Sequence, residues 1–295
     1  MKISNISIKV DTQFNDLILD EERSLYGISN AAVKKCVFDG PADGESALKE
    51  SHDIKVIDCN FKLRYPLWHV TNALIENCQM DTGCRAALWY DKNLQIRESR
   101  INGIKAVREC EFISIKNCKI QSEEFVWYSK NIEIYNSKLI SEYAFLNSVN
   151  LHLESFNMKG KYSFQYVENV EIHNSNLDTK DAFWHAKNVT IYDSIVNGEY
   201  LGWYSENLKL VRCTIKGTQP FCYAKGLVLE DCTMIGCDLA FEKSDVHATV
   251  LSCIDSIKNP ISGYIKAASI GEIISDNNSS CVIEFGKNEK TSIAC

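Results

Sequence analysis

Carboxylates, aromatic rings and cysteines are the side chains in this sequence that could carry chemistry or bind a ligand. The carboxylate candidates are Asp178, Asp181 and Glu199, and His185 lies close to them along the chain. Two carboxyl groups about 5 to 9.5 Å apart can hydrolyse a glycosidic bond, and a histidine can transfer protons. These four residues are the candidate catalytic residues. The alternative interpretation is that they are solvated surface groups.

The aromatic candidates form two neighbouring columns at a fixed position of an internal repeat. The first column contains Trp68, Trp89, Trp127, Trp184 and Trp203. Its neighbour contains, among others, Tyr128, His185 and Tyr204. Because consecutive residues of a strand point to opposite faces, only one of the two columns can face solvent in a regular strand.

We expect the tryptophan column outside, because Glu123, Glu142 and Lys180 share its parity along the strand. Ser129 and Ser205 share the same parity and look buried, which argues the other way. An exposed row of rings could stack on the faces of sugars. The alternatives are internal packing of the rings and a protein interface that buries them.

The cysteines are predicted to be small buried residues. Of the 13 cysteines, Cys59 and Cys78 occupy the same position of successive repeats, as do Cys213 and Cys232. No Cys-x-x-Cys pair occurs, although metal sites usually need such local pairs. No glycine-rich phosphate loop occurs either. We therefore expect no metal and no cofactor.

A repeat must position all of these groups. Its clearest copies are Glu124–Ser137, Asp181–Ser194 and Tyr200–Cys213. Each copy ends an apolar-x-apolar-x-x unit on a small residue, except that one copy has Phe156 at this position. These positions are Cys36, Cys59, Cys78, Ser99, Cys118, Ser137, Phe156, Ser175, Ser194, Cys213, Cys232 and Cys253. From Ser99 to Cys232 they are spaced by 19 residues, seven intervals that add to 133 residues.

Each repeat reads as three short strands separated by turns. The apolar-x-apolar pair, such as Ile132 and Ile134, is typical of a strand with one buried face. A second strand follows, and the aromatic segment forms the third. A column of asparagines, including Asn131 and Asn188, closes each repeat, where a tight bend needs a residue that tolerates a positive φ.

The repeat predicts an all-β protein, a single right-handed parallel β-helix with about 19 residues per rung and about 11 to 12 rungs. Residues 1–20 are expected to form an N-terminal cap and residues 21–253 the β-helix repeats. Residues 254–295 are expected to form an irregular last rung and a C-terminal cap. The whole is predicted to be one structural domain.

Composition limits the partners. The formal net charge is -7 and the charges are interspersed, so no basic stripe is available for nucleic acid. The sequence shows no secretory leader and no run of apolar residues that predicts a membrane helix. The number of cysteines, 13, is odd, and many of them fall at one repeat position. Both features favour a reducing, cytoplasmic location.

The signature Trp-(Tyr/His)-(Ser/Ala)-(Lys/Glu)-Asn occurs at Trp127–Asn131, Trp184–Asn188 and Trp203–Asn207. This 19-residue repeat resembles an uncharacterised bacterial family of right-handed β-helix proteins, within the broad pectin-lyase-like fold class. The resemblance covers roughly residues 20–260. It implies the fold, and it brings no activity and no catalytic residues.

We expect a protein that binds an extended carbohydrate-like ligand on its aromatic face. One alternative is a polysaccharide-acting hydrolase or lyase that uses Asp178, Asp181, His185 and Glu199. The other is a non-catalytic scaffold that forms a homo-oligomer through the aromatic row. A glycan or small-molecule ligand is the expected partner, without nucleic acid or membrane.

Overall fold

The computed structural model describes residues 6–40, 45–276 and 278–286. The chain divides into two compact units, Met1–Phe156 and Asn157–Cys295, which we call the N-terminal and C-terminal units and describe separately. Within the described residues no helix is found, and hence no helix that could span a membrane.

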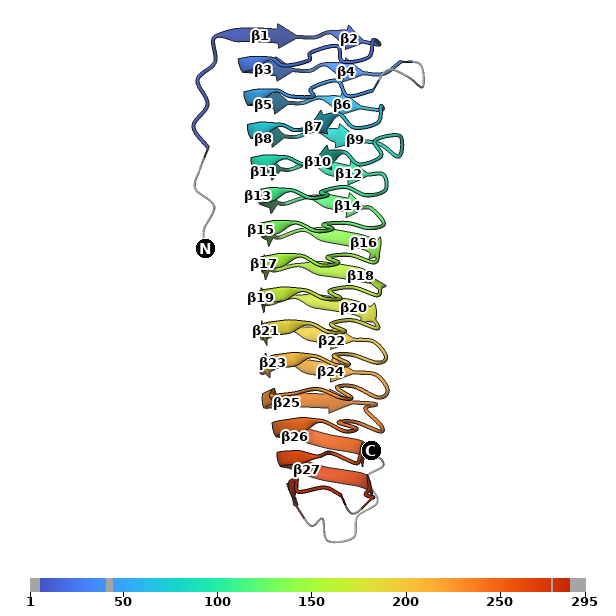
Figure 1. The fold of residues 1–295 in the computed structure, drawn as a ribbon. Coiled ribbons are helices and arrows are strands. Elements are labelled where there is room, and N and C mark those ends of the chain that lie inside the picture. Colours follow the sequence, from blue (N-terminus) through green and yellow to red (C-terminus); the bar gives the residue numbers. More distant parts are fainter. Residues whose placement is uncertain (1–5, 41–44, 277, 287–295) are drawn as a thin grey trace. The chain divides into compact units, whose positions relative to one another are not determined.

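In the N-terminal unit, short parallel strands from successive rungs pair with one another to form two sheets (Figure 1). The first sheet contains β1 (Thr12–Asn15), β3 (Ser29–Lys34), β5 (His52–Ile57), β8 (Thr71–Glu76), β11 (Lys92–Arg97), β13 (Glu111–Lys116), β15 (Lys130–Tyr135) and β17 (Val149–Glu154). The second sheet contains β2 (Ile18–Leu19), β4 (Val37–Phe38), β6 (Asn60–Phe61), β9 (Gln79–Met80), β12 (Arg100–Asn102), β14 (Lys119–Gln121) and β16 (Lys138–Glu142). A further short pair is formed by β7 (Leu67–Trp68) and β10 (Leu88–Trp89).

The C-terminal unit repeats the arrangement. Its strands are β18 (Asn157–Lys161), β19 (Glu168–His173), β20 (Asn176–Lys180), β21 (Lys187–Tyr192), β22 (Ile195–Asn197), β23 (Glu206–Val211), β24 (Thr214–Lys216), β25 (Leu227–Ile235), β26 (Asp245–Lys258), β27 (Ser262–Ile274) and β28 (Val282–Phe285). The first sheet contains β19, β21 and β23, and the second contains β18, β20, β22 and β24. Strand β25 is long enough to pair in both sheets.

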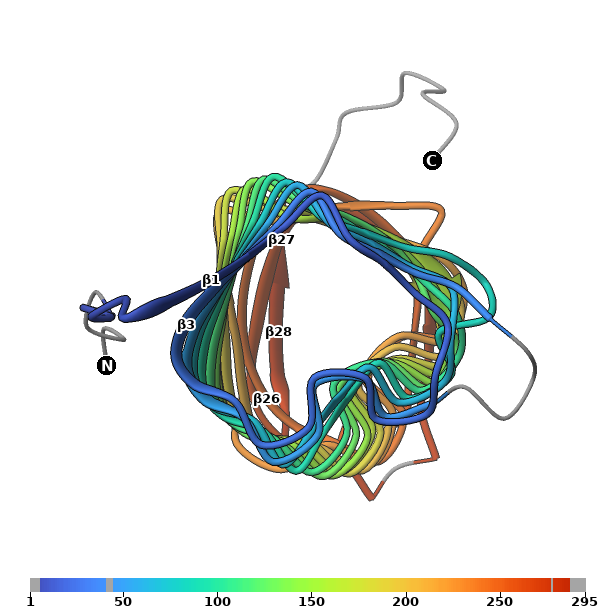
Figure 2. The same cartoon turned by 90° about the horizontal axis from the view of Figure 1, so that it is seen from above.

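The predicted register is confirmed. In the N-terminal unit Ile113 pairs with Ile132, and Ile132 pairs with Leu151. In the C-terminal unit Val189 pairs with both Val170 and Leu208. Viewed from the β1 side, the chain runs clockwise as it recedes, so the coils are right-handed (Figure 2). The fold is therefore the predicted all-β, right-handed parallel β-helix.

The described residues make about 14 turns, more than the expected 11 to 12. The difference arises because parallel pairing includes β1 and β2 at one end and continues through β27 and β28 at the other. The boundaries of the caps at residues 20 and 254 stay predictions.

The core of each unit is built from stacked apolar side chains. Inward residues of the first sheet, such as Ile134 and Ile172, are fully buried. Buried residues of the third segment complete the interior, and phenylalanines hold this place in several rungs. Phe164 and Phe183 stack with their ring centroids 4.8 Å apart and their planes within 8°. Stacking like residues one rung apart keeps the interior close-packed.

The asparagine column has the predicted conformation. Asn169, Asn188 and Asn207 have φ values of 57°, 53° and 55°, and Gly226 continues the column at 62°. The Asn188 side-chain amide donates a hydrogen bond of 3.2 Å to Asn169, and that of Asn207 donates one of 3.0 Å to Asn188. The asparagines therefore satisfy both the bend of each rung and the hydrogen bonding between rungs.

Candidate functional site

The ring-bearing segment of each rung departs from a regular strand. In residues 124–128, Glu124, Val126 and Tyr128 have φ values of 56°, 54° and 53°. In residues 181–185, Asp181, Phe183 and His185 have φ values of 52°, 62° and 55°. Because every second residue is left-handed, the alternation of side chains across a strand is lost here.

Both ring columns consequently face outward, which differs from the expectation that one of them would lie inside. Tyr128 and Tyr204 are 45% and 44% exposed. The tryptophans of the adjacent column are half-buried, and their exposed parts lie on the outside as well. These residues are Trp68, Trp89, Trp127, Trp184 and Trp203. The inward places are taken by residues such as Val126 and Phe183, which are buried. In each unit, we call the outer surface formed by the two columns the ring face of that unit.

The tryptophan rings are fixed by the backbone. The indole N–H of Trp184 donates a hydrogen bond of 2.7 Å to the carbonyl oxygen of Tyr200. That of Trp203 donates one of 2.8 Å to the carbonyl oxygen of Gln219, and that of Trp127 donates to the carbonyl oxygen of Tyr143. The orientation of each of these rings is therefore set before any ligand binds.

In the C-terminal unit the outer rings form a continuous ladder. Tyr166, His185, Tyr204 and Tyr223 stack with centroid separations of 4.9, 5.1 and 4.8 Å, and their planes lie within 10° of one another. Trp184 and Trp203 stack beside them at 5.5 Å. Neighbouring rings thus cover one another's faces, and ring edges and tyrosine hydroxyls point to solvent.

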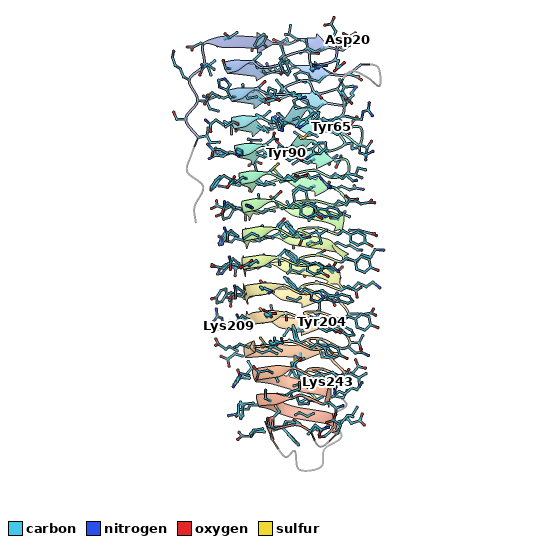
Figure 3. The ribbon with its side chains drawn as sticks, in the orientation of Figure 1. Asp20, Tyr65, Tyr90, Tyr204, Lys209 and Lys243 are labelled. Atoms are coloured by element: carbon cyan, nitrogen blue, oxygen red, sulfur yellow. The ribbon has the colours of Figure 1, made fainter. Side chains whose placement is uncertain are left out.

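In the N-terminal unit the ladder is interrupted. Trp68 stacks on Trp89 at 5.4 Å, but the next position of the tryptophan column is Arg108, which is followed by Trp127. The neighbouring column likewise has Glu109 between Tyr90, labelled in Figure 3, and Tyr128. A cavity of about 580 Å³ lies at this interruption. Sequence reasoning missed this site, although a non-aromatic pair at a ring position was a visible signal.

The predicted catalytic residues do not converge on one centre. The Asp178 carboxylate accepts a hydrogen bond of 2.8 Å from the Asn197 side chain. His185 is stacked between Tyr166 and Tyr204, and among the described residues it has no carboxylate partner. A catalytic role for these residues stays a prediction.

Asp181 and Glu199 are the predicted pair that the structure brings together. Asp181 is 8% exposed, and burial raises the pKa of its carboxyl. Lys180 opposes this rise of the pKa and Glu199 adds to it. Glu199 is exposed, and its Oε2 atom lies 3.9 Å from Nζ of Lys180. The two acids therefore differ in environment, as an acid and a base would, but no histidine joins them.

A second concave site, absent from the sequence-based candidates, lies on the outer face of the first sheet in the N-terminal unit. This groove has a volume of about 810 Å³. Glu133 lines it and is only 5% exposed. Burial, together with the nearby Glu133 and Glu154 carboxylates, raises the pKa of Tyr135 to about 12. His152 Nε2 lies 3.9 Å from Glu154 Oε2. The signal in the sequence was a titratable residue between two buried apolar ones, as at Ile132-Glu133-Ile134.

The anchor column contains six buried free cysteines and one partly exposed, disulfide-bonded cysteine, Cys253. Cys118 donates to the carbonyl oxygen of Lys116 at 3.3 Å, and Cys213 donates to that of Val211 at 3.4 Å. Burial raises the pKa of Cys118 to about 11. The Cys118 thiol therefore stays protonated, and both buried cysteines act as small core residues, which is the role predicted for them.

Three solved structures illustrate what the chain is similar to. The tailspike protein of E. coli bacteriophage HK620 in complex with a pentasaccharide has 9% identity and a TM-score of 0.43, over 94% of this chain and 68% of that chain. The A-module of the Azotobacter vinelandii mannuronan C-5 epimerase AlgE4 has 11% identity and a TM-score of 0.39, over 97% and 91%. PfbA, a surface adhesin of Streptococcus pneumoniae, has 11% identity and a TM-score of 0.36, over 90% and 72%. All three TM-scores are below 0.5.

A comparison with curated protein sequences gives no significant match. Among protein families, residues 12–284 match the one described as "Protein of unknown function (DUF3737)". This match covers nearly all of the rungs described above, including the ring face and the groove. The chain therefore belongs to the DUF3737 family of proteins of unknown function.

Proposed function

We propose that this protein is a non-catalytic binding protein for an extended, carbohydrate-like ligand that lies along the ring face. The observation that carries the proposal is that, within each unit, both ring columns lie on the outer surface. Rings such as Tyr204 and Tyr128 are nearly half exposed there and recur at every rung or every second rung. Tyrosine and tryptophan combine an apolar body with a polar edge, which suits a polyhydroxylated ligand.

The rigidity of the ladder supports this proposal. The outer rings of the C-terminal unit are spaced by 4.8 to 5.1 Å, and the tryptophan N–H groups are bonded to the backbone. A surface fixed in this way loses little conformational entropy on binding. The covered ring faces mean that the ligand meets ring edges and hydroxyls along the ladder, so its contacts are amphipathic rather than purely apolar.

We expect the double substitution Tyr166→Asn and Tyr204→Asn to weaken binding of the extended ligand by about tenfold or more. The positive φ of both positions, 55° and 57°, suits asparagine, and Asn147 occupies the same column at 51°. The fold is therefore retained while two rings and two hydroxyls are removed. A glycan array followed by calorimetric titration of the best-binding glycan measures the change.

Tyr192→Asn is the matched control, because Tyr192 is a partly exposed tyrosine of the same unit on the first sheet, away from the ring face. Equal affinity of wild type and the double variant would contradict the proposal. Light scattering on both proteins tests the alternative of a scaffold: loss of an oligomer in the double variant would favour a ring face that binds a second copy. Cytoplasmic location stays a prediction in either case.

Polysaccharide cleavage is the second candidate function, and the observation that favours it is the first-sheet groove. Glu133 and Glu154 lie one rung and two residues apart, which places their Cβ atoms about 8 Å apart by strand geometry. Side chains that start from this Cβ separation can bring their carboxyl groups to the roughly 5–9.5 Å that hydrolysis by two carboxylates needs. We expect an enzyme to release reducing ends from a polysaccharide panel and to lose this activity in Glu133→Gln and Glu154→Gln. No release by the wild-type protein would rule this candidate out.

A further inference from the structure

The interruption of the ring ladder in the N-terminal unit leaves a place without a ring. In the outer column Glu109 separates Tyr90 from Tyr128, and the adjacent rings of the protein stack at 4.8 to 5.5 Å. Tyr90 and Tyr128 are two rungs apart, which is roughly 10 Å. That distance accommodates one additional ring between them. The cavity at this point is lined by residues of both flanking rungs and of the interrupted rung: Tyr90, Lys92, Arg108, Glu109, Cys110, Glu111, Tyr128 and Lys130.

The interrupted rung supplies a cation and an anion at this place instead of two rings. Arg108 lies between the two columns, with its guanidinium carbon 5.4 Å from the centroid of Trp127 and 5.8 Å from that of Tyr128. Glu109 is directed toward the preceding rung, where it accepts a hydrogen bond from the Tyr90 hydroxyl and lies 3.5 Å from the indole nitrogen of Trp89. Tyr90 stacks on Trp89 of its own rung, at a centroid separation of 5.3 Å, rather than on a ring of the next rung.

The charges around the gap favour an anion. The lining of the gap contains three cations and two anions. The cations are Lys92, Arg108 and Lys130, and the anions are Glu109 and Glu111. Among the residues that the structure describes, the side chains of Lys92 and Lys130 have no hydrogen bond or ion pair, and the two residues flank Glu111 in register. The ion pairs of Arg108 are long, 3.5 Å to Glu109 and 3.6 Å to Glu124. A carboxylate of a ligand would offer all three cations a closer partner.

We propose that the gap between Tyr90 and Tyr128 binds one ring of a ligand that bears a carboxylate. The ring takes the place of the missing side-chain ring, and the carboxylate lies against Arg108, Lys92 and Lys130. This inference rests on the proposed function, since it names the part of the ring face where a ligand ring inserts. The shared chemistry fits an acidic sugar and an aromatic carboxylate alike.

The test uses a variant that completes the ladder. Glu109→Tyr places a tyrosine where the φ of 54° matches that of Tyr90 and Tyr128, 57° and 53°. We expect it to melt at or above the wild-type temperature and to bind carboxylated rings at least about tenfold more weakly, because its own ring fills the gap. Titrations by NMR use N-acetylneuraminate and 4-hydroxybenzoate as the two sources of a carboxylated ring. N-acetylglucosamine serves as the uncharged ring, which we expect to bind about tenfold more weakly to wild type.

Asn147→Tyr is the matched control, because it adds a ring to the same column of the same unit beyond Tyr128 and outside the gap. We expect it to bind like wild type. The double variant Lys92→Gln and Lys130→Gln should lose affinity for the carboxylates while keeping its affinity for N-acetylglucosamine.

Unchanged binding in Glu109→Tyr would overturn the inference. So would equal affinity for charged and uncharged rings, or failure of both carboxylates to bind wild type. The proposed function is decided separately, by the response of the extended ligand to the loss of Tyr166 and Tyr204 in the other unit.

Discussion

Replacing Phe183 by alanine is expected to lower the free energy of unfolding by about 3–5 kcal/mol. The ring is 1% exposed and stacks on Phe164, so its removal leaves a cavity that rigid neighbouring rungs cannot close. Alanine tolerates the positive φ of this position no worse than phenylalanine does, so the loss reports on packing. Urea denaturation of the full chain, followed by circular dichroism, measures it.

His185→Ala is the control, because His185 lies on the same segment with its ring on the outer surface. Only its stacking on two tyrosines is lost, which we expect to cost under about 1.5 kcal/mol. If both substitutions had equally small effects, the assignment of Phe183 to the interior and His185 to the surface would be wrong.

Replacing Asp91 by serine is expected to stabilise the protein by about 2 kcal/mol or more near neutral pH. Asp91 is fully buried in the column of small inward residues that continues with Cys110 and Ser129. Its Oδ1 accepts a hydrogen bond of 2.8 Å from the backbone N–H of Val70, while Oδ2 has no partner among the described residues. A serine can keep the useful bond, since Ser129 Oγ accepts one of 3.1 Å from the backbone N–H of Cys110.

The gain should depend on pH, because burial raises the pKa of the Asp91 carboxyl well above the ordinary value of 3.8. Above that ordinary value the unfolded chain releases a proton that the folded protein still holds. Stability of the wild type therefore falls by up to about 1.4 kcal/mol per pH unit until the pH reaches the folded-state pKa. The serine variant lacks this loss, so its advantage grows as pH rises and shrinks toward about pH 4.

Thermal melts of both proteins across this range measure the effect. The reciprocal variant Ser129→Asp places a carboxyl at an equally buried position of the same column and should show the opposite dependence. A stability difference that does not change with pH would mean that Asp91 is ionised in the folded protein.

The fold could be predicted from the sequence because each rung repeats the same local demands. The spacing from Ser99 to Cys232 sets the register, and the observed pairing of Ile132 with Leu151 follows it. The asparagine column was predictable for the same reason, since a bend at positive φ selects asparagine or glycine. Such rules act over a few residues and are copied from rung to rung.

The candidate sites were less predictable, because they depend on backbone geometry and on neighbouring rungs. The left-handed residues at Tyr128 and Val126 are neither asparagine nor glycine, so nothing in their type indicated that both ring columns would face out. The burial of Glu133 and the cavity beside Glu109 arise from side chains about 19 residues apart in sequence. The residue pattern of one rung does not predict how the side chains of neighbouring rungs are oriented.

Fluorine NMR of protein labelled with 5-fluorotryptophan tests the central claim most directly. The chain has five tryptophans, and all of them lie in the ring column, so every resonance reports on the ring face. Titration with the glycan selected on the array should shift these resonances in a saturable way, at the same concentration at which calorimetry shows binding. Binding by calorimetry with all five resonances unmoved would place the ligand elsewhere and contradict the claim that the ring face binds it.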